Sequence, residues 1–97
     1  MLYVGSDHAL SAFLKEALKE LSCCVVCCPR GREARLFIGS KIKYSLLLFD
    51  EELPDTTGAE LEGFARLQAH RSLTPVIIFK KSDDWQRLAS DIQRLLS

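Results

Sequence analysis

The chain has 97 residues, and its 13 basic and 13 acidic side chains cancel. This balance excludes a global field that would steer the protein to nucleic acid or to an anionic membrane surface, and no apolar run reaches the roughly 20 residues of a membrane span. The length suits one small domain, residues 1–97, and the lack of a basic and then apolar leader at the N-terminus leads us to expect a cytoplasmic protein.

Two elements are expected at the N-terminus. Residues 2–4 form a short strand, and apolar side chains then recur at helical spacing up to Leu21, which predicts an amphipathic helix over about residues 8–21. Ser6 or Asp7 directly precedes this helix, and either side chain is suited to cap its first turn.

The segment 23–28 contains all four cysteines: Cys23, Cys24, Cys27 and Cys28. The spacing of Cys24 and Cys27 could indicate a thiol redox or metal site. However, Val25 and Val26 oppose the turn that such a site needs, and alternation along a strand points Cys24 and Cys27 to opposite faces. We therefore expect a buried strand here, with a thiol redox protein as an alternative function. A turn at residues 29–31 and a weaker helix that ends at Gly39 follow.

The most informative stretch runs from Tyr44 to Gly58. The uninterrupted apolar residues 46–49 predict a strand, over residues 45–49, that is buried on both faces, as in a parallel sheet covered by helices. Asp50 then lies at the carboxyl end of this strand, where the ligand crevices of open α/β sheets lie. A proline-containing loop follows, and Thr57 and Glu60 have the spacing of a capping box that starts the next helix.

The last part of the chain predicts a helix, a strand and a final helix. The first helix covers about residues 58–69, and residues 76–79 form the fourth strand. The final amphipathic helix has Ser82 as its expected N-cap, with Asp83 and Asp84 complementing the helix dipole. Candidates for the buried faces of these two helices are Leu61, Phe64, Ala65, Leu67, Trp85, Leu88, Ala89, Ile92, Leu95 and Leu96.

Strands that alternate with helices imply βαβ units. With right-handed crossovers, four such units give a three-layer α/β fold in which helices cover both faces of a parallel sheet.

The segment around Asp50 resembles the phosphoacceptor region of response-regulator receiver domains, the switch modules of two-component signalling. The family pattern is an apolar strand, the phosphoacceptor Asp, two variable residues, an apolar residue and Pro, and a loop that ends in Gly. Asp50, Leu53-Pro54 and Gly58 fit this spacing. Residues 25–34 are similar to the family's second strand and the opening of its second helix, and residues 74–79 to its fourth strand. The resemblance implies a flavodoxin-like, receiver-like sheet with strand order 2-1-3-4, in which the family's fourth helix and fifth strand are missing.

The resemblance also implies which parts of the family's site are kept. Asp50 is the candidate catalytic residue, as the phosphoacceptor, and the backbone carbonyl of Glu52 matches a metal ligand of the family. The family's acidic pair after the first strand has become Gly5-Ser6, with Asp7 one place further on. In one register Lys80 stands where the family has a Thr or Ser; in the other, Lys80 or Lys81 resembles the Lys after the family's fifth strand, with Ser82 where a Pro is usual. The pocket residues are then Ser6, Asp7, Lys80 and Lys81 around Asp50, and Mg²⁺, the one cofactor to consider, would be bound by Asp50, Asp7 and the Glu52 carbonyl.

Asp50 has two interpretations. It can pair with Lys80 or Lys81 across the edge of the sheet, which would hold the pocket in one state without phosphate. Alternatively, Asp50 is a working phosphorelay acceptor that uses Mg²⁺ and receives its phosphoryl group from a histidine kinase. We favour a degenerate receiver-like module that acts mainly through a protein partner in a signalling pathway and is not an enzyme beyond autophosphorylation of Asp50.

The missing fifth strand predicts self-association. Residues 76–79 would be an open edge of β-prone apolar residues, and such edges pair with other chains unless they are blocked. The lost helix would also uncover part of one face of the sheet. We expect a homodimer that forms through the fourth strand and the last helix.

Overall fold

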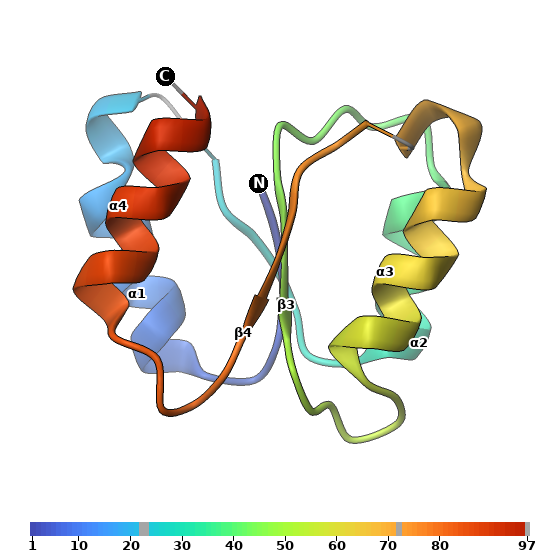
Figure 1. The fold of residues 1–97 in the computed structure, drawn as a ribbon, viewed down its shortest axis with the longest axis horizontal. Coiled ribbons are helices and arrows are strands. Elements are labelled where there is room, and N and C mark those ends of the chain that lie inside the picture. The colour runs from blue at the N-terminus through green and yellow to red at the C-terminus, as the bar shows by residue number, and fades with distance from the viewer. Residues whose placement is uncertain (22–23, 72, 97) are drawn as a thin grey trace.

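A four-stranded parallel sheet forms the centre of the molecule (Figure 1). The computed structural model describes residues 1–21, 24–71 and 73–96. The strands lie in the order β2-β1-β3-β4, which confirms the expected fold class, and only residues 80–84 separate β4 from the last helix, too few for a further helix and strand. The strands are β1 (Leu2–Val4), β2 (Val26–Cys28), β3 (Leu47–Asp50) and β4 (Val76–Phe79).

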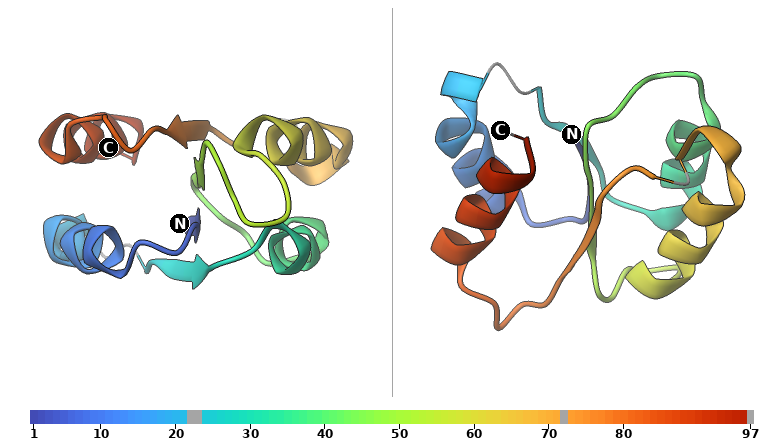
Figure 2. Two further views of the ribbon diagram at one scale, coloured as in Figure 1. Left: turned by 90° about the horizontal axis from the view of Figure 1, so that it is seen from below. Right: turned by 45° about the horizontal axis from the view of Figure 1, so that its top comes forward.

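Helices cover both faces of the sheet and complete three layers (Figure 2). One face is covered by α1 and α4, and the other by α2 and α3. None of the helices in the described residues is both long and apolar enough to cross a membrane. The helices are α1 (His8–Ala17), α2 (Gly31–Gly39), α3 (Gly58–Leu67) and α4 (Trp85–Leu96), and the short 3-10 helices η1 (Lys19–Leu21) and η2 (Ala69–Arg71) follow α1 and α3.

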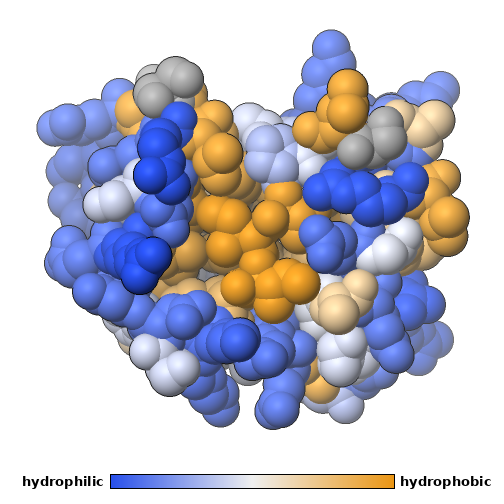
Figure 3. Space-filling view, viewed as in Figure 1, coloured by the Kyte–Doolittle hydropathy of each residue, from blue (hydrophilic) through white to orange (hydrophobic). Residues whose placement is uncertain are grey.

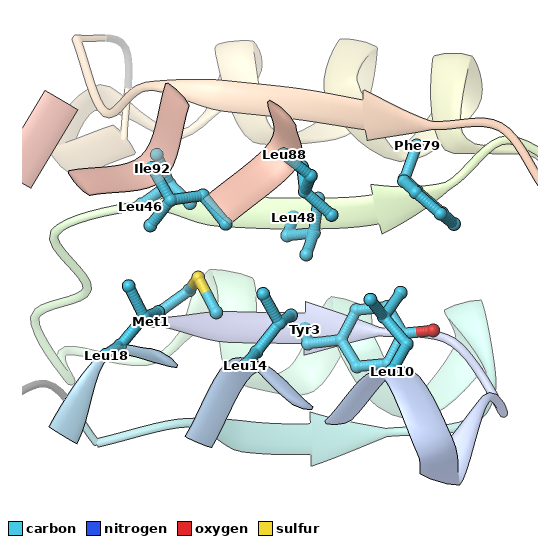
Figure 4. Close-up of a cluster of buried hydrophobic side chains, with 10 residues drawn as sticks. All are labelled: Met1, Tyr3, Leu10, Leu14, Leu18, Leu46, Leu48, Phe79, Leu88 and Ile92. Carbon is cyan, nitrogen blue, oxygen red and sulfur yellow. The ribbon is translucent and has the colours of Figure 1, made fainter. Parts of the chain in front are cut away.

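The core has two halves, one on each face of the sheet. Leu46 and the residues of β3 contribute side chains to both halves. Leu46 and Leu48 pack into the half beneath α1 and α4, whereas Leu47 and Phe49 pack into the half beneath α2 and α3. Figure 4 shows the first half, in which side chains of α1, α4 and the strands interdigitate. Since β3 is a central strand with helices on both faces, its uninterrupted apolar run is fully buried, as the sequence predicts.

Several helix boundaries and faces differ from the sequence-based expectation. The first helix ends at Ala17 and tightens into η1, so it does not run unbroken to Leu21. Leu67 is 82 % exposed because it follows Ala65 by two residues, about 200° around the helix from the buried face. Leu95 of α4 is 46 % exposed.

Ser82 is not the N-cap of α4. The helix begins at Trp85, and Oδ1 of Asp84 accepts a hydrogen bond from the backbone N–H of Gln86 at 2.8 Å. Oδ2 of Asp83 instead accepts from the backbone N–H of Lys80 at 2.9 Å and closes the turn after β4. The cap therefore lies directly before the helix, two residues later than expected.

The cysteine segment is less buried than expected. Cys23 lies outside the described residues, Cys24 and Cys27 are exposed, and only Cys28 is buried. The reason is that β2 is an edge strand, which pairs with β1 alone. The expected alternation of the strand is present, because Cys27 Sγ lies 2.8 Å from Ser11 Oγ on α1 whereas Cys28 packs into the core beneath α2 and α3.

One buried charge was not anticipated from the sequence. Arg71 of η2 is 2 % exposed, and its Nε donates to the carbonyl of Ile38 at 3.0 Å. Its Nη2 donates to the carbonyls of Ser40, at 3.2 Å, and of Ile42. The guanidinium also lies 4.9 Å from the ring centroid of Tyr44. Arg71 thus satisfies carbonyls at the end of α2 and has a structural role.

Candidate functional site

A pocket opens at the carboxyl edge of the sheet, where the segments after β1, β3 and β4 meet. Because the carboxyl ends of parallel strands share one edge, residues far apart in the sequence come together here. The pocket residues expected from the sequence all lie around this one cavity. Its lining residues are Ser6, Asp7, Asp50, Glu51, Glu52, Phe79, Lys80, Lys81 and Ser82.

Asp50 ends β3 and lies half-buried in this pocket. Its Oδ1 accepts a hydrogen bond from the hydroxyl of Tyr3 at 3.0 Å. Tyr3 is the middle residue of β1 and is buried in the core beneath α1 and α4, with its hydroxyl directed towards the carboxyl ends of the strands (Figure 4). Since the core fixes the ring, the hydroxyl is held on the Asp50 carboxylate.

Gly5 provides the space for this pair. A β-carbon at position 5 would lie 2.5 Å from Asp50 Cγ and closer still to Asp50 Oδ2 and the Tyr3 hydroxyl. The Tyr3 and Asp50 side chains thus occupy the space that any side chain at position 5 would need. The resemblance expects an acidic residue at position 5, and the Tyr3–Asp50 contact leaves no space for such a side chain there.

The surroundings of Asp50 favour its neutral form. Burial is the largest cause and raises the pKa of this carboxyl above its usual range. The hydrogen bond from Tyr3 lowers the pKa, the negative charge of Asp7 raises it further, and the Lys81 ammonium lowers it. The net direction is upward. Burial, followed by the charge of Asp50, also raises the pKa of Tyr3, so that its hydroxyl remains a donor at neutral pH.

The expected ion pair between Asp50 and a lysine is not present. In the part of the chain that the structure describes, the ion pairs are Lys19–Glu16, Arg66–Glu62 and Arg94–Asp91. Lys80 and Lys81 are exposed, and the turn that Asp83 closes carries them past the end of β4. Tyr3 is therefore the direct partner of Asp50, and Lys81 acts on it only through its charge.

The carboxylates of Asp7 and Asp50, two of the expected Mg²⁺ ligands, each already accept a hydrogen bond within the chain. Mg²⁺ prefers octahedral oxygen coordination, including one or two carboxylates. Asp7 Oδ1 accepts a hydrogen bond from the backbone N–H of Leu10 at 3.0 Å, which confirms Asp7 as the N-cap of α1, and Asp50 Oδ1 is bonded to Tyr3. Across residues 1–21, 24–71 and 73–96, no three His, Cys, Asp or Glu side chains gather where they could hold a metal ion.

The loop after Asp50 is fixed by Asp55, which the sequence analysis did not single out. The Asp55 carboxylate accepts hydrogen bonds from the backbone N–H groups of Gly31, at 3.0 Å, and Arg32, at 2.8 Å. These groups open α2, whose N-cap Arg30 provides no side-chain cap. The hydrogen bond from the backbone N–H of Arg32 is the main reason why the pKa of the Asp55 carboxyl lies below its usual range. This link fixes the loop that carries the chain from Asp50 to α3.

Gly58 allows α3 to begin directly beside Asp50. A β-carbon at this position would lie 2.6 Å from the backbone oxygen of Asp50. Thr57 caps the helix, since its hydroxyl accepts from the backbone N–H of Glu60 at 3.2 Å. The expected start of this helix is confirmed, and it holds the end of β3 in place.

Among the comparisons with known proteins, the one with solved structures supports this fold. No protein-family model and no curated protein matches the chain. The structure is similar to the receiver domain of a signal transduction histidine kinase from Syntrophus aciditrophicus, with a TM-score of 0.81 and 24 % identity over 98 % of this chain and 87 % of that one. It is also similar to the chemotaxis response regulator CheY4 of Vibrio cholerae, with a TM-score of 0.80 and 20 % identity over 97 % of this chain and 95 % of that one.

A third similar structure has a metal ion in its site. It is the receiver domain of the sensor histidine kinase PA1611 from Pseudomonas aeruginosa, which has a magnesium ion coordinated in its active site cleft. The TM-score is 0.78, and the identity is 18 % over 98 % of this chain and 94 % of that one. At these identities the matches establish the fold alone, a receiver-domain fold that has four strands in the described residues of this chain.

Proposed function

We propose that this chain is a receiver-like signalling module that works mainly through protein–protein interaction and that its phosphoacceptor pocket is degenerate. The observation that carries the proposal is the hydrogen bond from the Tyr3 hydroxyl to Oδ1 of Asp50, at 3.0 Å. It engages the carboxylate that a receiver domain would use as its nucleophile.

The chemistry of phosphoryl transfer explains why this contact matters. An aspartate nucleophile needs an accessible carboxylate oxygen and a cation that neutralises the phosphodonor. Here one Asp50 oxygen is bonded to Tyr3, Gly5 contributes no carboxylate, and Asp7 caps α1. The pocket is thus held in one arrangement by the chain's own side chains, without phosphate. A module of this kind presents a constant surface to its partners.

The partners that we propose are proteins, including a second copy of the chain. Strand β4 is an open edge of the sheet, and its residues Val76, Ile77 and Ile78 are partly exposed. Homodimerisation would cover this edge. Light scattering coupled to size exclusion over a dilution series tests this part: a dimer mass at micromolar concentration is expected, and a monomer mass throughout would refute the homodimer.

A working phosphoacceptor is the second candidate. It is favoured by the position of Asp50, at a strand end in an open pocket with the Lys81 ammonium acting on it. The similar receiver domain with magnesium in its cleft also points to this chemistry. In this case Asp50 would accept a phosphoryl group from a histidine kinase, and the Tyr3 hydroxyl would have to release it.

Beryllofluoride, which mimics a phosphoryl group on aspartate, separates the two candidates. Amide NMR spectra of the wild-type protein are recorded with beryllium and fluoride, with and without Mg²⁺. The degenerate pocket predicts no Mg²⁺-dependent shift around Asp50. Saturable, stoichiometric shifts that Asp50→Asn abolishes would refute the proposal and establish the phosphoacceptor.

A further inference from the structure

The open edge of the sheet is flanked by two helices. β4 lies between α3 and α4, at the same level as both (Figure 2). A band of apolar side chains runs over β4 between two polar flanks (Figure 3), and Val76, Ile77 and Ile78 are its partly exposed members. A second molecule that covers this band must therefore also contact the flanking helices.

Helix α4 and its N-cap, Asp84, present an alternating row of charges beside this edge. Asp84, Arg87 and Asp91 line one hollow together with Ile77 and Ile78 of β4. Arg94 continues the row one turn further and pairs with Asp91 of its own helix at 2.8 Å. Arg87 stands three residues after one acid and four before the next, yet it forms no ion pair with any residue that the structure describes.

This row is complementary to itself. When two copies of a helix pack antiparallel about a two-fold axis, residues equally far before and after the axis face each other. If the axis crosses α4 at the level of residue 89, position 87 faces position 91 and position 84 faces position 94 of the other copy. Each of these pairs joins an acid to a base. A second α4 therefore meets opposite charge at all four positions, which no unrelated partner would do by construction.

We infer that α4 packs antiparallel against α4 of a second copy, with Arg87 facing the partner's Asp91 and Asp84 facing the partner's Arg94. The inference rests on the homodimer proposed above and specifies its seam. Asp91 then lies between Arg94 of its own helix and the partner's Arg87. Ile77, Ile78 and the exposed Leu95 supply apolar contact beside the charged row, so the same seam covers the apolar band on β4.

A charge-exchange experiment tests this register. In a dimer of Arg87→Glu, the new acid at position 87 faces Asp91 of the second copy at both symmetric contacts, so acid meets acid. In a dimer of Asp91→Arg, the new base at position 91 faces Arg87 of the second copy at both contacts, so base meets base. Each variant is expected to dimerise at least about tenfold more weakly than the wild type. In an equimolar mixture, however, a heterodimer pairs Glu with Arg and Asp with Arg, so the mixture is expected to recover the dimer mass. Lys15→Glu, on α1, is the matched control and should dimerise like the wild type.

Sedimentation velocity measures the monomer and dimer fractions of the wild type, of the three variants and of the mixture. Far-UV circular dichroism confirms that each variant keeps the fold, as expected because Arg87 and Lys15 are exposed and Asp91 is partly exposed. If both single variants dimerise like the wild type, or if the mixture stays as monomeric as its components, the α4 seam is wrong while self-association stands. A wild type that is monomeric throughout overturns the seam together with the homodimer, and leaves the beryllofluoride result on Asp50 unaffected.

Discussion

The Tyr3 hydroxyl and the Asp50 carboxylate meet across the two central strands of the sheet, 3.0 Å apart. Tyr3 pairs in register with Leu48, and Asp50 follows Leu48 by two residues on the same face of β3. The length of the phenol ring spans this offset and carries the hydroxyl to the carboxyl edge. The pair therefore follows from strand register, and its consequences can be tested in solution.

Removing the hydroxyl should destabilise the protein. In Tyr3→Phe the ring still fills the core, but Asp50 loses its partner while it stays half-buried, at a cost of about 1–3 kcal/mol at pH 7. Urea denaturation measures the difference. Tyr44→Phe is the matched control, since the Tyr44 hydroxyl forms no hydrogen bond with the described residues, and it should change stability by less than about 0.5 kcal/mol. Equal effects of the two substitutions would argue against the contact.

Asp50→Asn should be neutral or stabilising at pH 7. The folded protein raises the pKa of Asp50, so the stability that this group contributes is complete below its unfolded pKa of about 3.9 and is lost as pH rises through the folded pKa. Asn does not ionise and can still accept from Tyr3. The advantage of the variant should therefore shrink as the pH falls towards about 3 in urea titrations. A variant clearly less stable than the wild type at pH 7 would instead indicate a lysine partner for Asp50.

Gly5→Ala should be destabilising, by about 1–3 kcal/mol, because its β-carbon would displace the Asp50 carboxylate and the Tyr3 hydroxyl. Gly63→Ala is the control, since a β-carbon there meets nothing within 4 Å and alanine favours the interior of α3 by about 0.5–1 kcal/mol. The midpoint temperature of thermal unfolding should therefore fall in Gly5→Ala and rise in Gly63→Ala. A Gly5→Ala protein as stable as the wild type would mean that the pocket has room at this position.

The cysteines should differ in their rates of alkylation. Cys24 and Cys27 are exposed and should react in the native protein, whereas Cys28 is buried, and burial raises the pKa of its thiol. Peptide mapping after brief iodoacetamide treatment at neutral pH measures the three rates. Rapid labelling of Cys28 would contradict its placement. A rate for Cys24 or Cys27 far above that of an ordinary thiol would favour the thiol redox alternative.

The sequence predicts the elements that depend on local pattern. Four features follow from periodicity and capping rules: the apolar run of β3, the strand at residues 76–79, a cap of α1 at Ser6 or Asp7, and the start of α3 at Gly58. A phenol in the middle of an apolar strand was also a signal, because a buried Tyr needs a partner for its hydroxyl.

Contacts between distant segments could not be predicted in the same way. Which residue meets Tyr3 depends on strand register, and the exposure of Cys27 depends on β2 being an edge. Asp55 reaches the start of α2 from another loop, and Arg71 reaches the end of the same helix from η2. Each of these contacts joins parts of the chain more than 20 residues apart, or depends on which strands neighbour each other, and local patterns carry no information on either.

Exposure to a small acyl-phosphate donor tests the central claim most directly. The wild-type protein and Asp50→Asn are incubated with acetyl phosphate and Mg²⁺, and their intact masses are recorded at once by electrospray mass spectrometry. Because Tyr3 engages the Asp50 carboxylate and Gly5 contributes no acid, we predict no phosphorylated wild-type species. A wild-type species heavier by one phosphoryl group, absent from Asp50→Asn, would contradict the account.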